Sequence, residues 1–492
     1  MYTQLITFII YLMVILALVL FSNYRTKDLS DYMLGGRNLG GAIAALGAGA
    51  SDMSSWLILA LPGAVIVNGL NELWLPVGLS IGQFLNWQLI SKRLRIYTEV
   101  ANDSITIPAY LENRFNDKTK ILRLVTAIVI VIFFTFYTAS GLVSGGLLFS
   151  SAFHISYTTA LIISSVIVVS YTCIGGFLAV SWIDFFQGCL MFFALLIIPA
   201  VTLHALHGLD NTMDIIRNYT TPGYLDAFSG ISTIGILSLL SWGLGYFGQP
   251  HILVRFMAMR THREAPKAQF ICMSWMNLSL YGAVFTGLFG MAFFAKSPLK
   301  DPETNFIHLS TLLFNPWISG ALLAAVLSAT MSTSSSQLLA SSSAIAEDFY
   351  RRFFRPKASA KELIIIARLG MLFIAVIAFA MALNTNNSIL HLVSHAWAGL
   401  GGAFGPVILI SLFWKRMNLQ GSIAGIITGT VVIFIWSYFK HLGGIFSLYE
   451  LIPAFLFNCI TIFVVSSLTK QPDESVLKDF EQTQLLLKSD KT

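Results

Sequence analysis

Long apolar stretches separated by short polar segments set the pattern of this chain. About 20 apolar residues are enough to cross the hydrocarbon core of a membrane as a helix. Read with a window of that length, the sequence predicts thirteen membrane-spanning helices and an all-α fold. They lie near residues 4–22, 40–66, 71–91, 122–149, 156–174, 185–206, 231–254, 269–295, 316–345, 363–383, 388–414, 421–439 and 449–468.

The composition agrees with an integral membrane protein. Of the 492 residues, 56% are hydrophobic and only 11% are charged, whereas soluble domains carry about 25% charged residues. The longest predicted loop, about residues 92–121, is too short to be a soluble domain. We therefore expect one membrane domain over residues 1–470 and a short cytoplasmic tail over 471–492, with an amphipathic segment near Val476–Leu487.

The basic residues predict how the chain is oriented. Counted from the first loop, alternate segments hold 26 of the 30 Lys and Arg residues. Cytoplasmic loops are the ones enriched in Lys and Arg, so the N-terminus is expected outside and the C-terminus in the cytoplasm. This asymmetry and anionic lipid also explain the formal net charge of +6, without any need for a nucleic-acid partner.

Two of the predicted spans are interrupted by glycine and small polar residues. The second contains Asp52 within residues 47–55, and the seventh contains the Gly-rich run 241–250. A carboxylate at this depth usually faces a pathway or a partner. Because the two spans are five apart, they stand at matching positions of two inverted units of five, as broken helices do in secondary transporters. The alternative is that Gly and Ser only allow neighbouring helices to pack closely.

The ninth span carries a cluster of hydroxyl side chains. Ten of the sixteen residues 328–343 are Ser or Thr, and apolar residues surround them on both sides, so the segment is expected to be helical. Hydroxyl and carbonyl oxygens are hard donors that suit Na⁺. Alternatively, these hydroxyls bond back to their own helix or join two helices.

Tyr137, Trp242 and Tyr246 are candidates for contact with a small solute. Trp242 and Tyr246 are spaced i, i+4 and flank two glycines, where unwound backbone can meet the charged ends of a ligand. Aromatic packing is the alternative. The sequence has no GxSxG, GxxxxGK[ST] or HExxH motif, which argues against an enzyme and against an organic cofactor.

Four sequence runs resemble the sodium/solute symporter family, and within it the bacterial members that carry proline. The resemblance extends over about residues 4–470. The runs are Asp31-Tyr-Met-Leu-Gly-Gly-Arg37, Gly47-Ala-Gly-Ala-Ser-Asp-Met-Ser-Ser-Trp56, Gly175-Gly-Phe-Leu-Ala-Val-Ser-Trp-Ile-Asp184 and Trp242-Gly-Leu-Gly-Tyr-Phe-Gly-Gln-Pro-His251.

The resemblance implies a leucine-transporter-like fold with a five-plus-five inverted repeat inside thirteen spans, and a place in the bacterial plasma membrane. It implies L-proline as the substrate, Na⁺ as the coupling ion, and no obligate protein partner. The implied Na⁺ ligands are the carbonyls of Ala50, Met53 and Ala329 and the hydroxyls of Ser332 and Thr333.

The same resemblance implies further roles. Asp52, Arg37 and Asp184 match positions tied to sodium coupling. Serine stands at Ser55 where the proline carriers usually have glycine, so close packing at that point is in question. The positions that match substrate contacts are Ser54, Ser55, Tyr137, Trp242, Tyr246 and Pro250.

The expected mechanism is alternating access, in which Na⁺ binds first, orders the broken second span and so raises the affinity for the zwitterion. Two alternatives stay open at this point. One is a sodium symporter for another small organic solute, and the other is a sensor that uses the transporter fold.

Overall fold

The computed structural model describes residues 2–23, 37, 39–174, 177–384 and 388–489. This part of the chain is helical, and its only β-type pairing is an isolated bridge between Leu39 and Met259. The long helices are α1 Tyr2–Asn23, α8 Ile121–Phe153, α9 Tyr157–Ile174, α10 Phe177–Ala205, α14 Ala265–Phe293, α16 Pro316–Ser343, α17 Ala360–Ala382, α18 Ile389–Phe413, α19 Leu419–Phe439 and α20 Leu451–Leu468.

The shorter helices form the broken spans and the ends of the molecule. They are α3 Gly41–Asp52, α4 Leu61–Asn68, α5 Trp74–Asn86, α6 Lys92–Val100, α7 Ile107–Arg114, α11 Leu209–Tyr219, α12 Thr233–Leu240, α13 Pro250–Met257, α15 Asn305–Leu313 and α21 Glu474–Ser489. Ten helical segments among the described residues are long and apolar enough to cross a membrane. The apolar segments Tyr2–Leu18 and Thr233–Gly248 are shorter than that limit.

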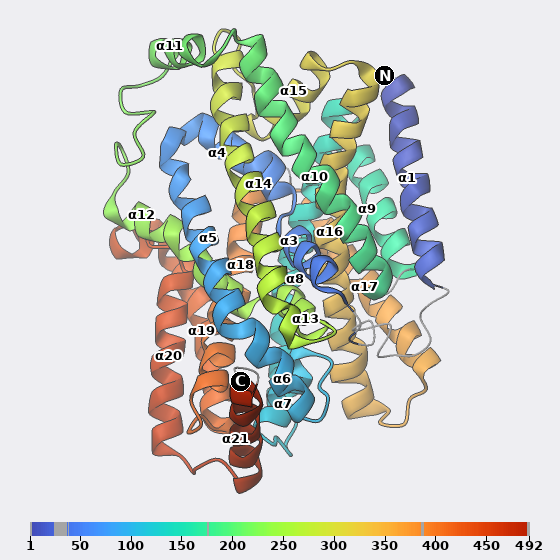
Figure 1. Cartoon of the computed structure of the whole chain (residues 1–492), viewed down its shortest axis with the longest axis vertical. Coiled ribbons are helices and arrows are strands. Elements are labelled where there is room, and N and C mark those ends of the chain that lie inside the picture. Colours follow the sequence, from blue (N-terminus) through green and yellow to red (C-terminus); the bar gives the residue numbers. More distant parts are fainter. Residues whose placement is uncertain (1, 24–36, 38, 175–176, 385–387, 490–492) are drawn as a thin grey trace.

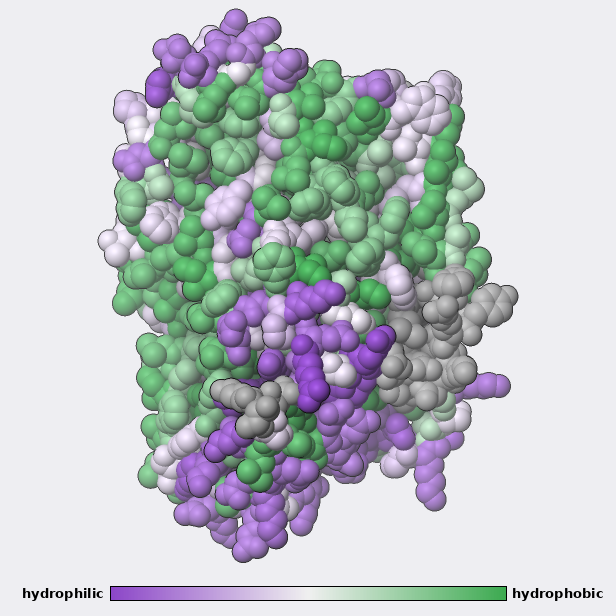
Figure 2. All heavy atoms as spheres, in the orientation of Figure 1, coloured by the Kyte–Doolittle hydropathy of each residue, from purple (hydrophilic) through white to green (hydrophobic). Residues whose placement is uncertain are grey.

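The surface of the molecule matches a membrane protein. Figure 2 shows hydrophobic residues over the middle of the visible face and hydrophilic residues gathered at its two ends. The two termini lie toward opposite ends of the long axis, with α1 starting at one end and α21 lying at the other (Figure 1).

Burial separates central from peripheral helices. In the segment that contains α16 and in α18, 89% of the most apolar window is buried, compared with 28% for the segment of α19 and 33% for α20. The Ser- and Thr-rich run of α16 is therefore in the protein interior. The peripheral helices expose large apolar side chains instead, as lipid-facing helices do.

The second predicted span is interrupted at Asp52. Helix α3 ends there, Met53 adopts ψ 76°, and a π-helical turn η2, Trp56–Ala60, leads into α4. The seventh predicted span also changes conformation. It passes from α12 into a 3₁₀ segment η5, Ser241–Gly248, and then through the extended residue Gln249 into α13. Both interruptions fall within the runs predicted to break the helix.

Three predicted span boundaries differ from the helix boundaries in the structure. The third span does not end at residue 91, because a π-helical turn η4, Trp87–Ser91, continues into α6. Helix α10 includes Asp184, which was expected to lie before the sixth span. Arg255, which was assigned to a cytoplasmic loop, is 1% exposed within α13. In the last two cases the charges were read as loop residues, but they pair with each other inside the protein.

Candidate functional site

The carboxylate of Asp52 is buried at the end of α3, next to the broken seventh span. The Tyr246 hydroxyl donates a hydrogen bond of 2.6 Å to Asp52 Oδ2. The Asp52 carbonyl accepts hydrogen bonds from Trp56 Nε1 at 3.1 Å and from the Tyr137 hydroxyl at 3.3 Å. Asp52 Oδ1 has no hydrogen-bond partner among the described residues. The end of α3 is therefore tied both to η5 and to α8.

Four of the five predicted Na⁺ ligands lie together between α3 and α16. The Ser332 hydroxyl is 3.0 Å from the Ala50 carbonyl oxygen and 3.3 Å from that of Ala329. The Thr333 hydroxyl is 3.5 Å from the same Ala50 oxygen. Met53, the fifth, is the residue at which α3 ends. Neutral carbonyl and hydroxyl oxygens that converge in this way fit a hard monovalent cation.

Aromatic side chains from three other segments surround Trp242 of η5. Its ring centroid is 5.4 Å from that of Tyr449 in a stacked arrangement, 6.5 Å from Trp397 and 6.3 Å from Trp56. Trp397 also meets Tyr246 edge to face at 5.0 Å. Trp242 and Tyr246, predicted from the sequence, thus belong to a larger aromatic cluster that also includes Trp56, Trp397 and Tyr449. Flat apolar faces of this kind suit a small ring.

The other predicted substrate residues lie at the two breaks. Ser54 Oγ accepts a hydrogen bond from the backbone N–H of Trp56 at 3.4 Å. The Ser55 hydroxyl is buried with no partner among the described residues. Pro250 is the first residue of α13, directly after the extended Gln249, and it lines a cavity on that side of the break.

Asp184 forms a buried ion pair with Arg255 of α13. Asp184 Oδ2 is 2.6 Å from Arg255 Nη2, and both side chains are at most 1% exposed. Arg255 also donates to the Ser181 hydroxyl at 2.5 Å and to that of Ser336 at 2.9 Å. A buried charge is tolerated only with such partners. The sequence predicts Asp184 but not Arg255.

Arg37 joins three segments. Its guanidinium pairs with Asp103 at 2.8 Å and donates to the Thr98 hydroxyl at 3.2 Å, the Ser104 carbonyl at 2.9 Å and the Met257 carbonyl at 2.7 Å. Arg37 thereby fixes the last residue of α13 to the segment that joins α6 and α7. The rest of its sequence motif, residues 31–36, lies outside the described part of the chain.

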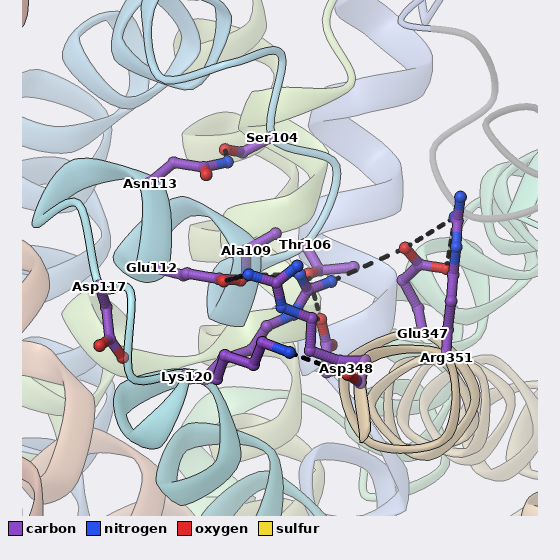
Figure 3. A network of polar contacts seen from close by, with 12 residues as sticks. Ser104, Thr106, Ala109, Glu112, Asn113, Asp117, Lys120, Glu347, Asp348 and Arg351 are labelled. Atoms are coloured by element: carbon purple, nitrogen blue, oxygen red, sulfur yellow. Dashed lines mark hydrogen bonds and ion pairs between the residues drawn. The ribbon is translucent and has the colours of Figure 1, made fainter. Parts of the chain in front are cut away.

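A cluster of ion pairs centred on Arg123 of α8 connects α7 with the π-helical segment η8, Ala344–Phe354 (Figure 3). Arg123 lies 2.8 Å from Glu112 Oε2, 2.7 Å from Asp348 Oδ1 and 3.7 Å from Glu347 Oε1. Asp348 Oδ1 also accepts a hydrogen bond of 3.2 Å from the Thr106 hydroxyl. Nothing in the sequence pattern singles out these residues, since their partners are far apart along the chain.

Trp397 is the residue of the site that the sequence reasoning missed most clearly. Its indole N–H donates a hydrogen bond of 2.8 Å to the Trp242 carbonyl, and its own carbonyl accepts one of 3.1 Å from the Gln249 side chain. Helix α18 therefore holds both ends of the irregular segment η5. A tryptophan beside the Gly399–Gly405 run was the available signal.

The fold is shared with two solved membrane symporters. A Na⁺-coupled sialic acid symporter, solved in a substrate-bound outward-open state, superposes with a TM-score of 0.80 at 17% identity, over 96% of this chain and 99% of that chain. A nucleobase-cation-symport-1 family transporter in a closed conformation superposes with a TM-score of 0.56 at 13% identity, over 93% and 99% of the two chains.

The family model for the sodium:solute symporter family matches residues 32–429, and the chain belongs to this family. It is 51% identical over 466 residues to a high-affinity proline transporter of Bacillus subtilis, covering 94% of this chain and 98% of the relative. It is 46% identical over 485 residues to the sodium/proline symporter of Escherichia coli, covering 97% and 96%.

Proposed function

We propose that this protein is a sodium-coupled symporter that imports L-proline by alternating access. The observation that carries the proposal is the meeting of neutral oxygens from α3 and α16 beside an aromatic cluster at two broken helices. Relatives named as proline transporters, at 46% to 51% identity over nearly the whole chain, support proline as the solute.

We assign Na⁺ to the carbonyls of Ala50, Met53 and Ala329 and the hydroxyls of Ser332 and Thr333. The hydroxyls of Ser332 and Thr333 both lie within hydrogen-bond distance of the Ala50 carbonyl oxygen, which supports the assignment. A bound cation would draw oxygens of the broken span and of α16 to one centre and so fix the break in one geometry. Asp52, one residue from Met53, would add negative potential without having to touch the ion.

We place proline next to the Na⁺ site, with its ring against Trp242 and Tyr246 and its charged ends at backbone and hydroxyl groups of the breaks. Tyr137, Ser54, Ser55 and Pro250 complete this proposed site. The Tyr137 hydroxyl and Ser54 lie beside the end of α3, which supports a substrate position against the same break that binds Na⁺. Ordering of one site would then raise the affinity of the other.

The proposal includes thirteen crossings in one membrane domain over residues 1–470, with an inverted repeat of five plus five spans. Two observations support it: α3 with α4, and α12 with α13, are interrupted spans five crossings apart, and the termini lie toward opposite ends of the molecule. With the Lys- and Arg-rich loops inside, the N-terminus faces outward and the C-terminus lies in the cytoplasm of a bacterium.

The driving force has a simple limit. A membrane potential contributes about 2.3 kcal/mol per charge per 100 mV, and a tenfold Na⁺ gradient adds about 1.4 kcal/mol. One Na⁺ per proline therefore supports an accumulation of roughly 500-fold.

Uptake of labelled proline into proteoliposomes, with gradients of Na⁺, Li⁺ and H⁺ imposed one at a time, tests the function. We expect accumulation with Na⁺. Competition by unlabelled carboxylates, vitamins and sugars separates proline from another solute. Binding of proline without counterflow would instead favour a sensor, the alternative left open by the sequence.

A further inference from the structure

Beyond the proposed central site, the structure contains a cavity whose walls carry buried polar atoms without partners among the described residues. It lies between the start of α7, α8, α13, α16 and η8, and Pro250 is part of its wall. Because Pro250 also borders the break at Gln249, this cavity starts where the proposed proline site ends. In the proposed orientation it extends toward the cytoplasm.

The donor side of the cavity is Arg255. Its Nη1 and Nη2 atoms are engaged by Ser181, Asp184 and Ser336, but Nε has no partner among the described residues. His251, one turn earlier on α13, also lines the cavity and has both ring nitrogens buried without a partner there. Buried polar atoms of this kind are normally satisfied by water or by a ligand.

The acceptor side is Asp348 of η8. Its Oδ1 atom is bonded to Arg123 and Thr106, while Oδ2 is buried with no partner among the described residues. Most of the remaining wall is apolar and includes Val254 and Leu339. One wall thus offers a positively charged donor, another offers a negatively charged acceptor, and apolar surface lies between them.

This arrangement matches a small zwitterion with an apolar ring. We propose that the cavity is a second station for the transported solute on its way to the cytoplasm, where the carboxylate meets Arg255 Nε and the ammonium meets Asp348 Oδ2. The inference rests on the proposed function, because it takes the transported amino acid as the ligand.

The size of the cavity makes occupancy depend on conformation. Its volume is about 50 Å³, which at about 10 to 15 Å³ per water is room for three to five waters. Proline has about eight heavy atoms, so the walls must separate before it enters. The wall formed by α7 and η8 is held by the Arg123 ion pairs, and loosening of that cluster would admit the solute.

The test compares the two faces of the transporter in proteoliposomes of known orientation. Asp348→Asn removes the charge at the proposed station. We expect the proline concentration for half-maximal efflux from the cytoplasmic face to rise at least tenfold, while that for uptake from the outer face stays within twofold. Asp214→Asn is the matched control, since Asp214 forms an ion pair with Arg217 at the surface and does not line the cavity. It should leave both values within twofold.

A second variant keeps the test decisive if Asp348→Asn does not fold. Leu339→Phe fills the cavity without changing an ion pair, and we expect the same one-sided loss. The second station would be overturned if, in the variants that fold, the half-saturating proline concentration at the cytoplasmic face changes less than twofold. Equal changes of this concentration at both faces would overturn it as well. Failure of the wild type to accumulate proline under a Na⁺ gradient would overturn the proposed function instead, so the two failures are distinguishable.

Discussion

Tyr246 and Asp52, which are 194 residues apart, are joined by a hydrogen bond of 2.6 Å from the phenol to the carboxylate. The aromatic residue that we place against proline and the carboxylate that we place beside Na⁺ therefore belong to one hydrogen-bonded unit. From the sequence alone, Tyr246 belongs with the substrate and Asp52 with the ion. The bond between them gives a direct physical route by which one ligand influences the other.

Tyr246→Phe should weaken both ligands. Loss of the hydroxyl leaves a second oxygen of Asp52 without a partner, and an unsatisfied buried group costs about 1 to 3 kcal/mol. Trp242→Ala should weaken proline strongly and leave Na⁺ unchanged, because it removes only apolar cover. Half-saturating Na⁺ and proline are measured for both, with the exposed Tyr219→Phe as the control. An unchanged Na⁺ requirement in Tyr246→Phe would contradict the coupling.

Asp52→Asn and Asp52→Ala should both reduce sodium-driven uptake severely and raise the half-saturating Na⁺ concentration. The physical reason is that each removes the negative charge one residue before the proposed ligand Met53. Asn keeps an acceptor for Tyr246, so it should retain more proline binding at saturating Na⁺ than Ala does. Wild-type dependence on Na⁺ in either variant would exclude a role of the carboxylate in coupling.

Ser332→Ala and Thr333→Ala should lower the affinity for Na⁺ more than they lower the affinity for proline measured at saturating Na⁺. Removal of one oxygen donor to a cation should cost about 1.5 to 3 kcal/mol, by analogy with hydrogen bonds to charged groups. That corresponds to roughly a 10- to 150-fold change in affinity. Ser342→Ala is the control, because its buried hydroxyl donates to the Leu339 carbonyl of its own helix and not to a residue of α3 in the described part of the chain. An equal effect of all three substitutions would point to helix packing.

Trp397→Phe should weaken proline binding and leave Na⁺ binding intact. The substitution keeps an aromatic ring beside Trp242 but leaves the Trp242 carbonyl without its donor. We expect a loss of about 1 to 3 kcal/mol, or roughly 5- to 150-fold in proline affinity. Trp414→Phe, at the far end of the same helix, is the matched control. Proline affinity unchanged from wild type would show that the hydrogen bond does not position the site.

Ser55→Gly should keep transport. The family resemblance raises the question whether serine disturbs close packing at this break, but Ser55 adopts φ −55° and ψ −21°, a right-handed conformation open to any residue. The backbone at residue 55 therefore does not require glycine. The buried hydroxyl has no partner among the described residues. If it binds the substrate, proline affinity at matched Na⁺ falls tenfold or more in Ser55→Gly; if not, affinity is unchanged or tighter.

Local composition was enough to find the two breaks, the hydroxyl cluster of the ninth span and the aromatic candidates Tyr137, Trp242 and Tyr246. The individual Na⁺ ligands were implied by the family resemblance. The run around Asp52 and the Gly-rich run before Pro250 each place several glycine and polar residues within about ten residues of an otherwise apolar span. The roles of Arg255 and Trp397 could not be assigned from local sequence, since they depend on partners 71 and 155 residues away. Without those partners, Arg255 resembles one more basic loop residue and Trp397 resembles one more packing aromatic.

The glycines of α5 allow the irregular seventh span to pack very closely, and this close packing restricts its motion. A Cβ at Gly78 or Gly82 would collide with the backbone of Leu240 or Gly243, and one at Gly248 would collide with the backbone of α18. Segment η5 is thus wedged between two helices and has little freedom left to lose. Residues 241–248 are already ordered in the folded protein without a ligand. Binding of proline should therefore not slow their amide hydrogen exchange further. Any protection brought by the ligands should appear at residues 53–57 instead.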